Sequence, residues 1–222
     1  MQRVMRLSAS DLLKERVDAA EEDVHFSEAL VEAVVAEYTK PGEVVLDPFA
    51  GYGTTLVVSE RMNRSAVGIE LLPDRVTIIR QRLGGSAQII EGDARNLAAM
   101  GLGQIDLCLT SPPYMSAADH PDNPLTGYRT LDGDYPTYLA ELAEVFAAVA
   151  QIVRPGGHLV INAANIRHGE LVTPLAWDIT TAVAQHVAFR AETYLEWDDP
   201  PEWMSGDYCL VFQKGLPGET QA

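Results

Sequence analysis

The segment Thr110-Ser111-Pro112-Pro113-Tyr114 has residue types that suit it to hold an amino group for chemistry. Its two prolines carry no N–H and fix the backbone, which leaves carbonyl groups free to face a ligand. The Ser111 hydroxyl and the Pro112 carbonyl can both accept hydrogen bonds from one amino group. An amino group on a heteroaromatic ring is a poor nucleophile because its lone pair is delocalised. Acceptors that hold its hydrogens help to localise that pair towards a methyl donor, and alignment with the donor supplies much of the rate.

We therefore predict a catalytic motif of Ser111, Pro112, Pro113 and Tyr114, with Tyr114 stacked on the flat ring of the acceptor. Taken alone, Pro-Pro-Tyr is more often a rigid loop with a packed tyrosine. The catalytic interpretation therefore depends on a donor site close by.

A glycine turn at Asp47 to Thr55 is the candidate donor site. Gly51 and Gly53 permit a sharp turn and a close approach of ligand to backbone, and Thr54 can cap the following helix, whose N-terminal amides attract a carboxylate. A lone Gly-x-Gly also occurs in dinucleotide sites, but the third glycine of that fingerprint is missing. Asp47 would repel a pyrophosphate and would suit the sulfonium and ammonium groups of S-adenosylmethionine.

Two more acids follow predicted strands. Glu70 ends the second strand, where a carboxylate can bind both ribose hydroxyls. Asp93 follows the third strand and is placed to accept from an adenine amino group. Each acid alone is about as often a solvated loop residue, but three acids just past consecutive strands favour one shared site.

These motifs need a scaffold that brings strand ends together, and the chain predicts one. Short apolar strands are expected at residues 44–46, 66–69, 88–90, 105–110, 158–162, 191–196 and 208–213. Helices are expected at residues 11–23, 27–38, 54–62, 73–83, 135–153 and 177–186. This alternation indicates a doubly wound α/β fold with a mostly parallel, seven-stranded sheet. Ligands bind such sheets past the carboxyl ends of the strands, near the switch point.

The paired motifs resemble those of the DNA amino-methyltransferases, the N6-adenine and N4-cytosine family. Residues 47–55 are similar to their cofactor motif, and residues 111–114 to their catalytic motif, whose first position is more often serine in the cytosine enzymes. His25-Phe26-Ser27 and the helix after it resemble the family segment that helps hold the methionine part of the cofactor. Residues 207–214 resemble the closing strand, so the likeness covers roughly residues 23 to 215.

The resemblance implies a Rossmann-like class I methyltransferase fold, S-adenosyl-L-methionine as cofactor, and methylation of an exocyclic amino group of a DNA base, with cytosine N4 favoured over adenine N6. It implies a catalytic domain at 23–215, after an N-terminal helical extension at 1–22 and before a tail at 216–222. The expected cofactor-binding residues are Phe26, Asp47, Pro48, Phe49, Ala50, Gly51, Gly53, Thr54, Thr55, Glu70, Asp93 and Ala94.

Two departures from the family leave the acceptor open. The cofactor motif precedes the catalytic one, whereas many relatives with a serine motif have the reverse order. No separate target-recognition domain is visible, so substrate contacts are expected from residues 115–134, 166–174 and 197–206. Similar motifs occur in transfer-RNA guanine methyltransferases, and the same core can serve a small-molecule or peptide acceptor.

Composition adds a constraint on partners. The 222 residues have a net charge of −16 and no basic run, whereas nucleic-acid binders usually carry a basic face. DNA is the expected partner, and a second copy (a homodimer) or a partner chain is a possible source of contacts to it. A third alternative function is a protein that binds the cofactor without catalysis. Cys108 and Cys209 each lie in an apolar run, which is typical of buried, reduced thiols in a cytoplasmic protein. We expect no membrane span, no signal peptide and no metal site.

Overall fold

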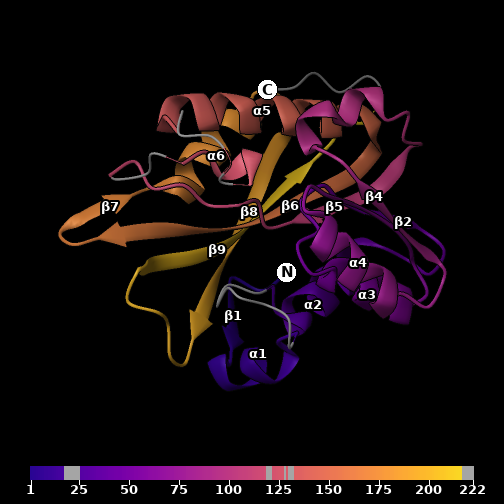
Figure 1. The fold of residues 1–222 in the computed structure, drawn as a ribbon, viewed down its shortest axis with the longest axis horizontal. Helices are drawn as coiled ribbons and strands as arrows, with labels where there is room; N and C mark the ends of the chain where they lie inside the picture. The colour runs from indigo at the N-terminus through magenta and orange to yellow at the C-terminus, as the bar shows by residue number, and fades with distance from the viewer. Residues whose placement is uncertain (18–25, 119–121, 128, 130–132, 217–222) are drawn as a thin grey trace.

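The computed structural model describes residues 1–17, 26–118, 122–127, 129 and 133–216. These residues form one twisted sheet with helices on both faces (Figure 1). The strands, in chain order, are β1 Val4–Leu7, β2 Val44–Asp47, β3 Ser65–Glu70, β4 Ala87–Glu91, β5 Ile105–Thr110, β6 Val153–His168, β7 Leu171–Thr173, β8 Ala188–Trp197 and β9 Met204–Gln213. The α-helices are α1 Ala9–Glu15, α2 Glu28–Tyr38, α3 Thr54–Arg61, α4 Pro73–Arg82, α5 Tyr135–Ile152 and α6 Leu175–Val183, and the 3-10 turns are η1 Ala94–Ala99 and η2 Pro124–Thr126.

The order of strands across the sheet is β1-β8-β9-β6-β5-β2-β3-β4, with β7 paired to β6. Strands β2 to β6 are parallel neighbours, and β9 runs antiparallel between β6 and β8. The chain leaves the outer strand β4 and returns to the middle of the sheet as β5, beside β2. This places the predicted donor turn and the predicted catalytic motif at the carboxyl ends of adjacent strands, as expected from the sequence.

The sheet has nine strands where seven were predicted, because β1 and β7 were not anticipated. β1 lies in the segment expected to be a helical extension, and it pairs in parallel with β8, with Val4 opposite Tyr194. The helix expected at 11–23 is shorter: α1 begins earlier, at Ala9, and ends at Glu15, and residues 18–25 lie outside the described part of the chain. β6 is much longer than the predicted 158–162, and its far end forms a hairpin with β7.

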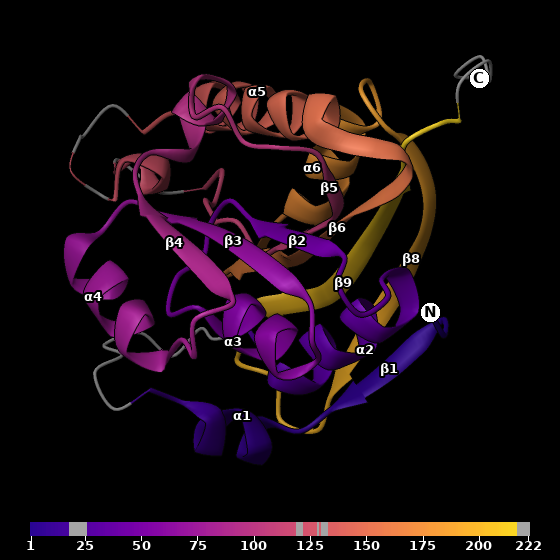
Figure 2. The same cartoon turned by 90° about the vertical axis from the view of Figure 1, so that its right-hand side faces the viewer.

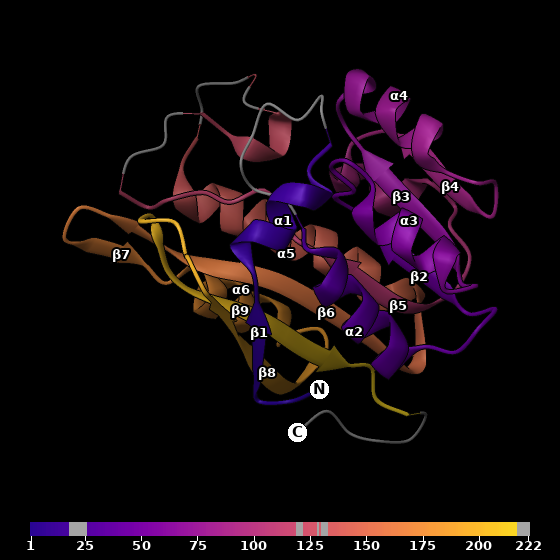
Figure 3. The same ribbon diagram turned by 90° about the horizontal axis from the view of Figure 1, so that it is seen from below.

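Apolar side chains build one core on each face of the sheet. Helices α2, α3 and α4 cover one face, where Leu30, Leu56 and Ile79 are fully buried. Helices α5 and α6 cover the other, with Phe146 and Ile179 in its core. Figures 2 and 3 show the sheet between these two layers. Alternate residues of the central strands face opposite layers, so both faces hold the strand ends in place.

The expectation that both cysteines are buried and free is confirmed. No helix among the described residues is long and apolar enough to cross a membrane.

Candidate active site

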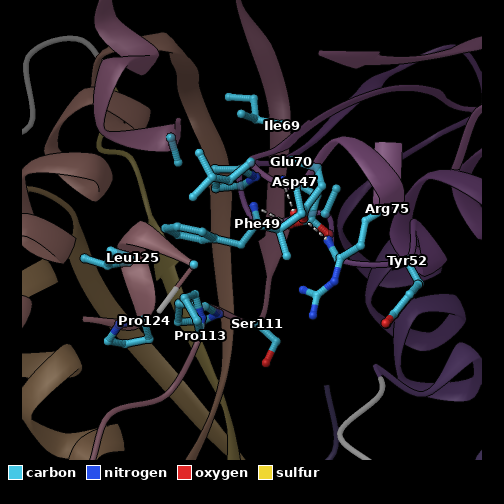
Figure 4. Close-up of a pocket in the computed structure, with 18 of the residues that line it drawn as sticks. Asp47, Phe49, Tyr52, Ile69, Glu70, Arg75, Ser111, Pro113, Pro124 and Leu125 are labelled. Atoms are coloured by element: carbon cyan, nitrogen blue, oxygen red, sulfur yellow. Dashed lines mark hydrogen bonds between the residues drawn. The ribbon is translucent and has the colours of Figure 1, made fainter. Parts of the chain in front are cut away.

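A cavity of about 290 Å³ lies past the carboxyl ends of β2, β3, β4 and β5. All four residues of the predicted catalytic motif line it, and so do all the predicted cofactor-binding residues except Gly53. Figure 4 shows Asp47, Glu70, Phe49 and Ser111 around this space, brought together from three strand ends. The two motifs therefore share one cavity, as the parallel sheet requires.

Gly53 lies behind the cavity wall and has a packing role. Its φ of +84° is in the left-handed region, where glycine is favoured. A Cβ atom at Gly53 would lie 3.0 Å from the Ile79 side chain of α4, closer than most real contacts. The glycine therefore allows the turn into α3 to pack against α4.

Asp47 is a buried carboxylate that links the two motifs. Its side chain is 2% exposed. It accepts a 2.6 Å hydrogen bond from the hydroxyl of Thr110, the residue just before the catalytic motif, and one of 3.1 Å from the Phe49 N–H. Burial raises the pKa of Asp47 to about 6, although the Thr110 and Phe49 hydrogen bonds act in the opposite direction. The carboxylate is therefore ionised at neutral pH and is poised to favour a cationic ligand.

Glu70 is held in one orientation by backbone amides. It accepts hydrogen bonds of 2.9 Å from Gly51 and 2.8 Å from Leu72. Burial raises the pKa of Glu70, and the Arg75 guanidinium of α4 opposes that rise. Two fixed carboxylates thus lie at the ends of neighbouring strands, β2 and β3.

Asp93 lines the cavity, and part of its acceptor capacity is used within the protein. Its carboxylate caps η1 by accepting from the Arg95 backbone N–H at 2.9 Å, and it pairs with the Arg95 guanidinium at 2.7 Å. Burial acts to raise the pKa of Asp93, but the bonds from Arg95 outweigh it and the pKa is lowered. Arg95 is also paired with Glu141 of α5.

Hydrogen bonds fix the catalytic motif in a definite order of donation. The Tyr114 hydroxyl donates to the Asn162 backbone carbonyl at 3.4 Å and lies 3.2 Å from the Ser111 hydroxyl. When the Tyr114 proton lies on Asn162, Ser111 is the donor to Tyr114. The lone pairs of the Ser111 oxygen then remain available to accept from a ligand.

The carbonyl groups of the two prolines have different surroundings. The Pro113 carbonyl accepts a 2.9 Å hydrogen bond from the hydroxyl of Tyr138, a buried residue of α5. Among the described residues, no hydrogen bond reaches the Pro112 carbonyl. One carbonyl therefore anchors the loop, and the other has no partner among the described residues.

Sequence reasoning missed several residues that line the cavity. Some adjoin predicted positions and were within reach of a wider motif, namely Tyr52, Ile69, Leu71, Leu72, Gly92 and Arg95. Pro124, Leu125 and Gly127 come from the loop expected to contact substrate. Arg75 and Asn162 come from α4 and β6, and no sequence signal pointed to them.

The donor set of this cavity fits the cofactor expected from the sequence. The Asp47 and Glu70 carboxylates supply negative charge and hydrogen-bond acceptors, which match cationic groups and ribose hydroxyls. Phe49 and Ile69 supply apolar surface for a flat ring. The described residues contain no cluster of ligands for a metal ion, and His120 and Asp119 lie outside them. Cys108 is fully buried and does not line the cavity.

Part of the chain is similar to known DNA methyltransferases. Residues 12–81 match a family model described as DNA methylase. The type II methyltransferase M.Cfr9I of Citrobacter freundii is 47% identical over 60 residues, which cover 27% of this chain and 20% of that protein. M2.DpnII of Streptococcus pneumoniae is 43% identical over 56 residues, 25% of this chain and 21% of that protein. The chain thus aligns with about one fifth of the length of these relatives.

Solved structures establish the fold over more of the chain. TrmN from Thermus thermophilus superposes with a TM-score of 0.63 at 18% identity, covering 85% of this chain and 49% of that one. An rRNA methylase from Streptococcus thermophilus gives 0.56 at 14% identity, covering 87% and 99%. These likenesses confirm the predicted α/β class I methyltransferase fold, for which S-adenosylmethionine is the implied cofactor. The chain is thus similar to DNA methylases over residues 12–81 and has the methyltransferase fold over most of its length.

Proposed function

We propose that this protein is an S-adenosylmethionine-dependent N-methyltransferase that acts on an exocyclic amino group of a DNA base. One observation carries the proposal: Ser111 and Pro112 line the same cavity as Asp47 and Glu70. Hydrogen-bond acceptors for an amino group and carboxylates for a cationic methyl donor therefore line one cavity. Methyl transfer requires the donor and the amino group to lie this close together.

The residues of the chain do three things in this reaction. Asp47 and Glu70 hold the cofactor, which when bound supplies an electrophilic methyl group on a sulfonium sulfur. Ser111 and the Pro112 carbonyl hold the acceptor amino group by its hydrogens, which directs the nitrogen lone pair at the methyl carbon. On methylation the amino nitrogen would lose one proton to water. Tyr114 packs on the acceptor ring and keeps it in line.

We propose cytosine N4 as the methylated position ahead of adenine N6. The support is the serine at position 111, which is commoner in the cytosine enzymes of the family that this chain resembles. A base in a duplex must leave the stack before it can enter a cavity, so a flipped or single-stranded base is the expected substrate.

A second candidate function is N-methylation of an RNA, a peptide or a small molecule. The net charge of −16 favours it, because phosphate contacts normally come from basic surfaces. Structural neighbours include an N-methyltransferase, NodS from Bradyrhizobium japonicum, with a TM-score of 0.59 at 11% identity. If the substrate is DNA, we expect a second copy or a partner chain to contribute basic contacts to the phosphates of the duplex.

We further propose that residues 23–215 form the catalytic domain and that the protein works in the cytoplasm, where the free thiols of Cys108 and Cys209 stay reduced.

The test is transfer of a labelled methyl group from S-adenosylmethionine to duplex DNA, single-stranded DNA and transfer RNA, each unmodified. Label in DNA alone is the expected result. Label in transfer RNA alone would replace the proposal by the second candidate. Protein that binds the cofactor and labels no nucleic acid would contradict the DNA assignment and direct the search to small molecules and peptides.

A further inference from the structure

We infer that Asn162 is a further substrate-contacting residue, whose side-chain oxygen accepts a hydrogen bond from the amino group to be methylated. This inference rests on the proposed function, which does not itself include Asn162. The residue lies on β6, and the neighbouring Ile161 pairs with Thr110 on β5. Asn162 is therefore level with Ser111 at the mouth of the adjacent strand, and it lines the same cavity.

A buried amide at this position needs an explanation. Asn162 is 8% exposed, and the residues two positions before and after it, Val160 and Ala164, are fully buried apolar residues. A polar side chain among such neighbours is destabilising unless its hydrogen-bonding groups find partners. The partners of Asn162 therefore indicate what the amide is for.

Both amide hydrogens of Asn162 are used inside the protein. The Nδ2 atom donates to Asp207 Oδ1 at 2.7 Å and to the Tyr208 carbonyl at 3.2 Å. The other Asp207 oxygen accepts from the Trp197 indole at 2.8 Å, so the carboxylate is itself held on both sides. Burial raises the pKa of Asp207 to about 6. It is therefore ionised at neutral pH and can only accept, which fixes the amide with its nitrogen inward.

The Oδ1 atom of Asn162 takes no part in these hydrogen bonds. Among the described residues, nothing donates a hydrogen bond to it. The backbone of the same residue accepts from Tyr114, so Asn162 is tied to the catalytic motif through its main chain. A fixed, unpaired acceptor thus lies next to Ser111 on the wall of the cavity.

Three oxygens, from Ser111, Pro112 and Asn162, therefore surround the position of the acceptor nitrogen. An amino group has two hydrogens, and three acceptors can share them through bifurcated bonds. Because both Nδ2 hydrogens of Asn162 are bonded within the protein, the amide cannot rotate to donate a hydrogen bond to a substrate carbonyl. We expect the wall to select a base with an amino group against one with a carbonyl group at the same position, since the carbonyl would leave all three oxygens unpaired.

The test compares Asn162→Ala with Asn165→Ala, a matched control on the same strand. Asn165 is 7% exposed, accepts a 3.0 Å hydrogen bond from the Ala176 N–H, and does not line the cavity. We expect Asn162→Ala to lower kcat/KM for the DNA acceptor roughly ten- to hundredfold, the loss for an unpaired buried polar group. Its affinity for the cofactor should stay within about twofold of wild type, the usual scatter for a site left untouched. Asn165→Ala should retain kcat/KM within about threefold.

A second measurement separates contact from structure. The affinity of the protein is measured for DNA with the normal target base and for DNA with an analogue whose amino group is replaced by hydrogen. Wild type is compared with Asn162→Ser, a variant that serves if Asn162→Ala does not fold. Wild type should prefer the amino base, and the variant should lose at least about fivefold of that preference.

The inference is overturned if wild type and variant prefer the amino base equally, or if kcat/KM is unchanged in Asn162→Ala. In either case a wild type that methylates DNA leaves the proposed function intact. A wild type that methylates no nucleic acid overturns both.

Discussion

At the scale of single residues, the site depends on carboxylates that the fold buries at a cost. Removing Asp47 from water disfavours its charged form, and the hydrogen bonds from Thr110 and Phe49 offset that effect in part. A cationic ligand beside Asp47 would stabilise the charged form of its carboxylate. Burial of Asp47 therefore reduces stability in the free protein and favours binding of the cofactor.

Cofactor affinity should accordingly depend on pH through Asp47. The pKa of about 6 in the free protein lies above the ordinary value of 3.8, so ionised Asp47 prevails above about pH 6. Each pH unit below 6 should weaken S-adenosylmethionine binding by up to about tenfold. In Asp47→Asn, affinity at pH 7.5 should fall and the dependence between pH 5 and 7 should flatten, as measured by titration calorimetry. An unchanged affinity would remove Asp47 from the binding site.

The same shift has a consequence for folding in the absence of cofactor. Between the unfolded and folded pKa values of Asp47 the native state binds more protons than the unfolded state. Stability from this group is therefore present at low pH and is lost as pH rises from about 4 to 6. The loss should be smaller in Asp47→Asn, measured as the free energy of unfolding in urea.

Tyr138 should matter for turnover and not for cofactor binding. Its hydroxyl holds the Pro113 carbonyl, and Tyr138→Phe removes that bond without changing the ring. We expect kcat to fall roughly five- to tenfold, since such a bond contributes about 1 kcal/mol. Tyr135→Phe is the matched control, because the Tyr135 hydroxyl bonds to Asp178 and not to the catalytic motif. Equal losses in both variants would mean that the effect is one of helix packing.

At the scale of elements, close contact between α3 and β3 positions the glycine turn. A Cβ atom at Gly68 would lie 2.8 Å from the Leu56 side chain of α3 and 3.0 Å from Ala50 in the turn. The absence of a side chain on β3 therefore sets how near the helix and the turn can approach the sheet.

Gly68→Ala should force these elements apart. We expect a loss of about 1–3 kcal/mol in the free energy of unfolding, as overpacking in a core generally causes, together with weaker cofactor binding. Gly103→Ala is the control, because a Cβ atom there meets nothing within 4 Å and the backbone is not left-handed. Chemical denaturation measures both variants. A Gly68→Ala variant as stable as Gly103→Ala would show that the contact is not tight.

The elements also show what the sequence can predict. The bounds of β5 were predicted at both ends, because an apolar run stops at Thr110 where polar and proline residues begin. β1 was missed because it has only four residues and is stabilised by pairing with β8, about 190 residues away, a contact that local pattern does not contain. The length of β6 was missed because its second half is stabilised by β7 and β9.

The site followed the same rule. Asp47, Glu70 and Ser111 were predicted because each lies at the end of a strand or just after it, and parallel strands place their ends together. Asn162 and Arg75 lie within a strand and a helix, where sequence gives no reason to prefer them over their neighbours. Their positions on the cavity follow from packing across the sheet.

At the scale of the whole molecule, charge limits how the protein can hold nucleic acid. The chain has 32 acidic and 16 basic residues, and several arginines are engaged in ion pairs, among them Arg61, Arg95 and Arg154. The excess of acidic over basic residues gives the protein a negative field that repels phosphates. Recognition is therefore expected to come mainly from the base inside the cavity.

The affinity for single-stranded DNA should depend only weakly on salt. Because each phosphate contact contributes a slope of about −0.7 in log affinity against log salt, we expect a total slope no steeper than about −2 between 50 and 200 mM salt, measured by fluorescence anisotropy. A slope near −5 would reveal a basic surface supplied by another copy or by a partner chain.

The position of the transferred methyl group tests the central claim most directly. DNA is incubated with the protein and S-adenosylmethionine, digested to nucleosides and analysed by mass spectrometry against standards. We predict methyl on an exocyclic nitrogen, as N4-methylcytosine, and none when Tyr114 is replaced by alanine. Methyl on a ring carbon or a ring nitrogen would contradict the role assigned to the Ser111–Tyr114 motif.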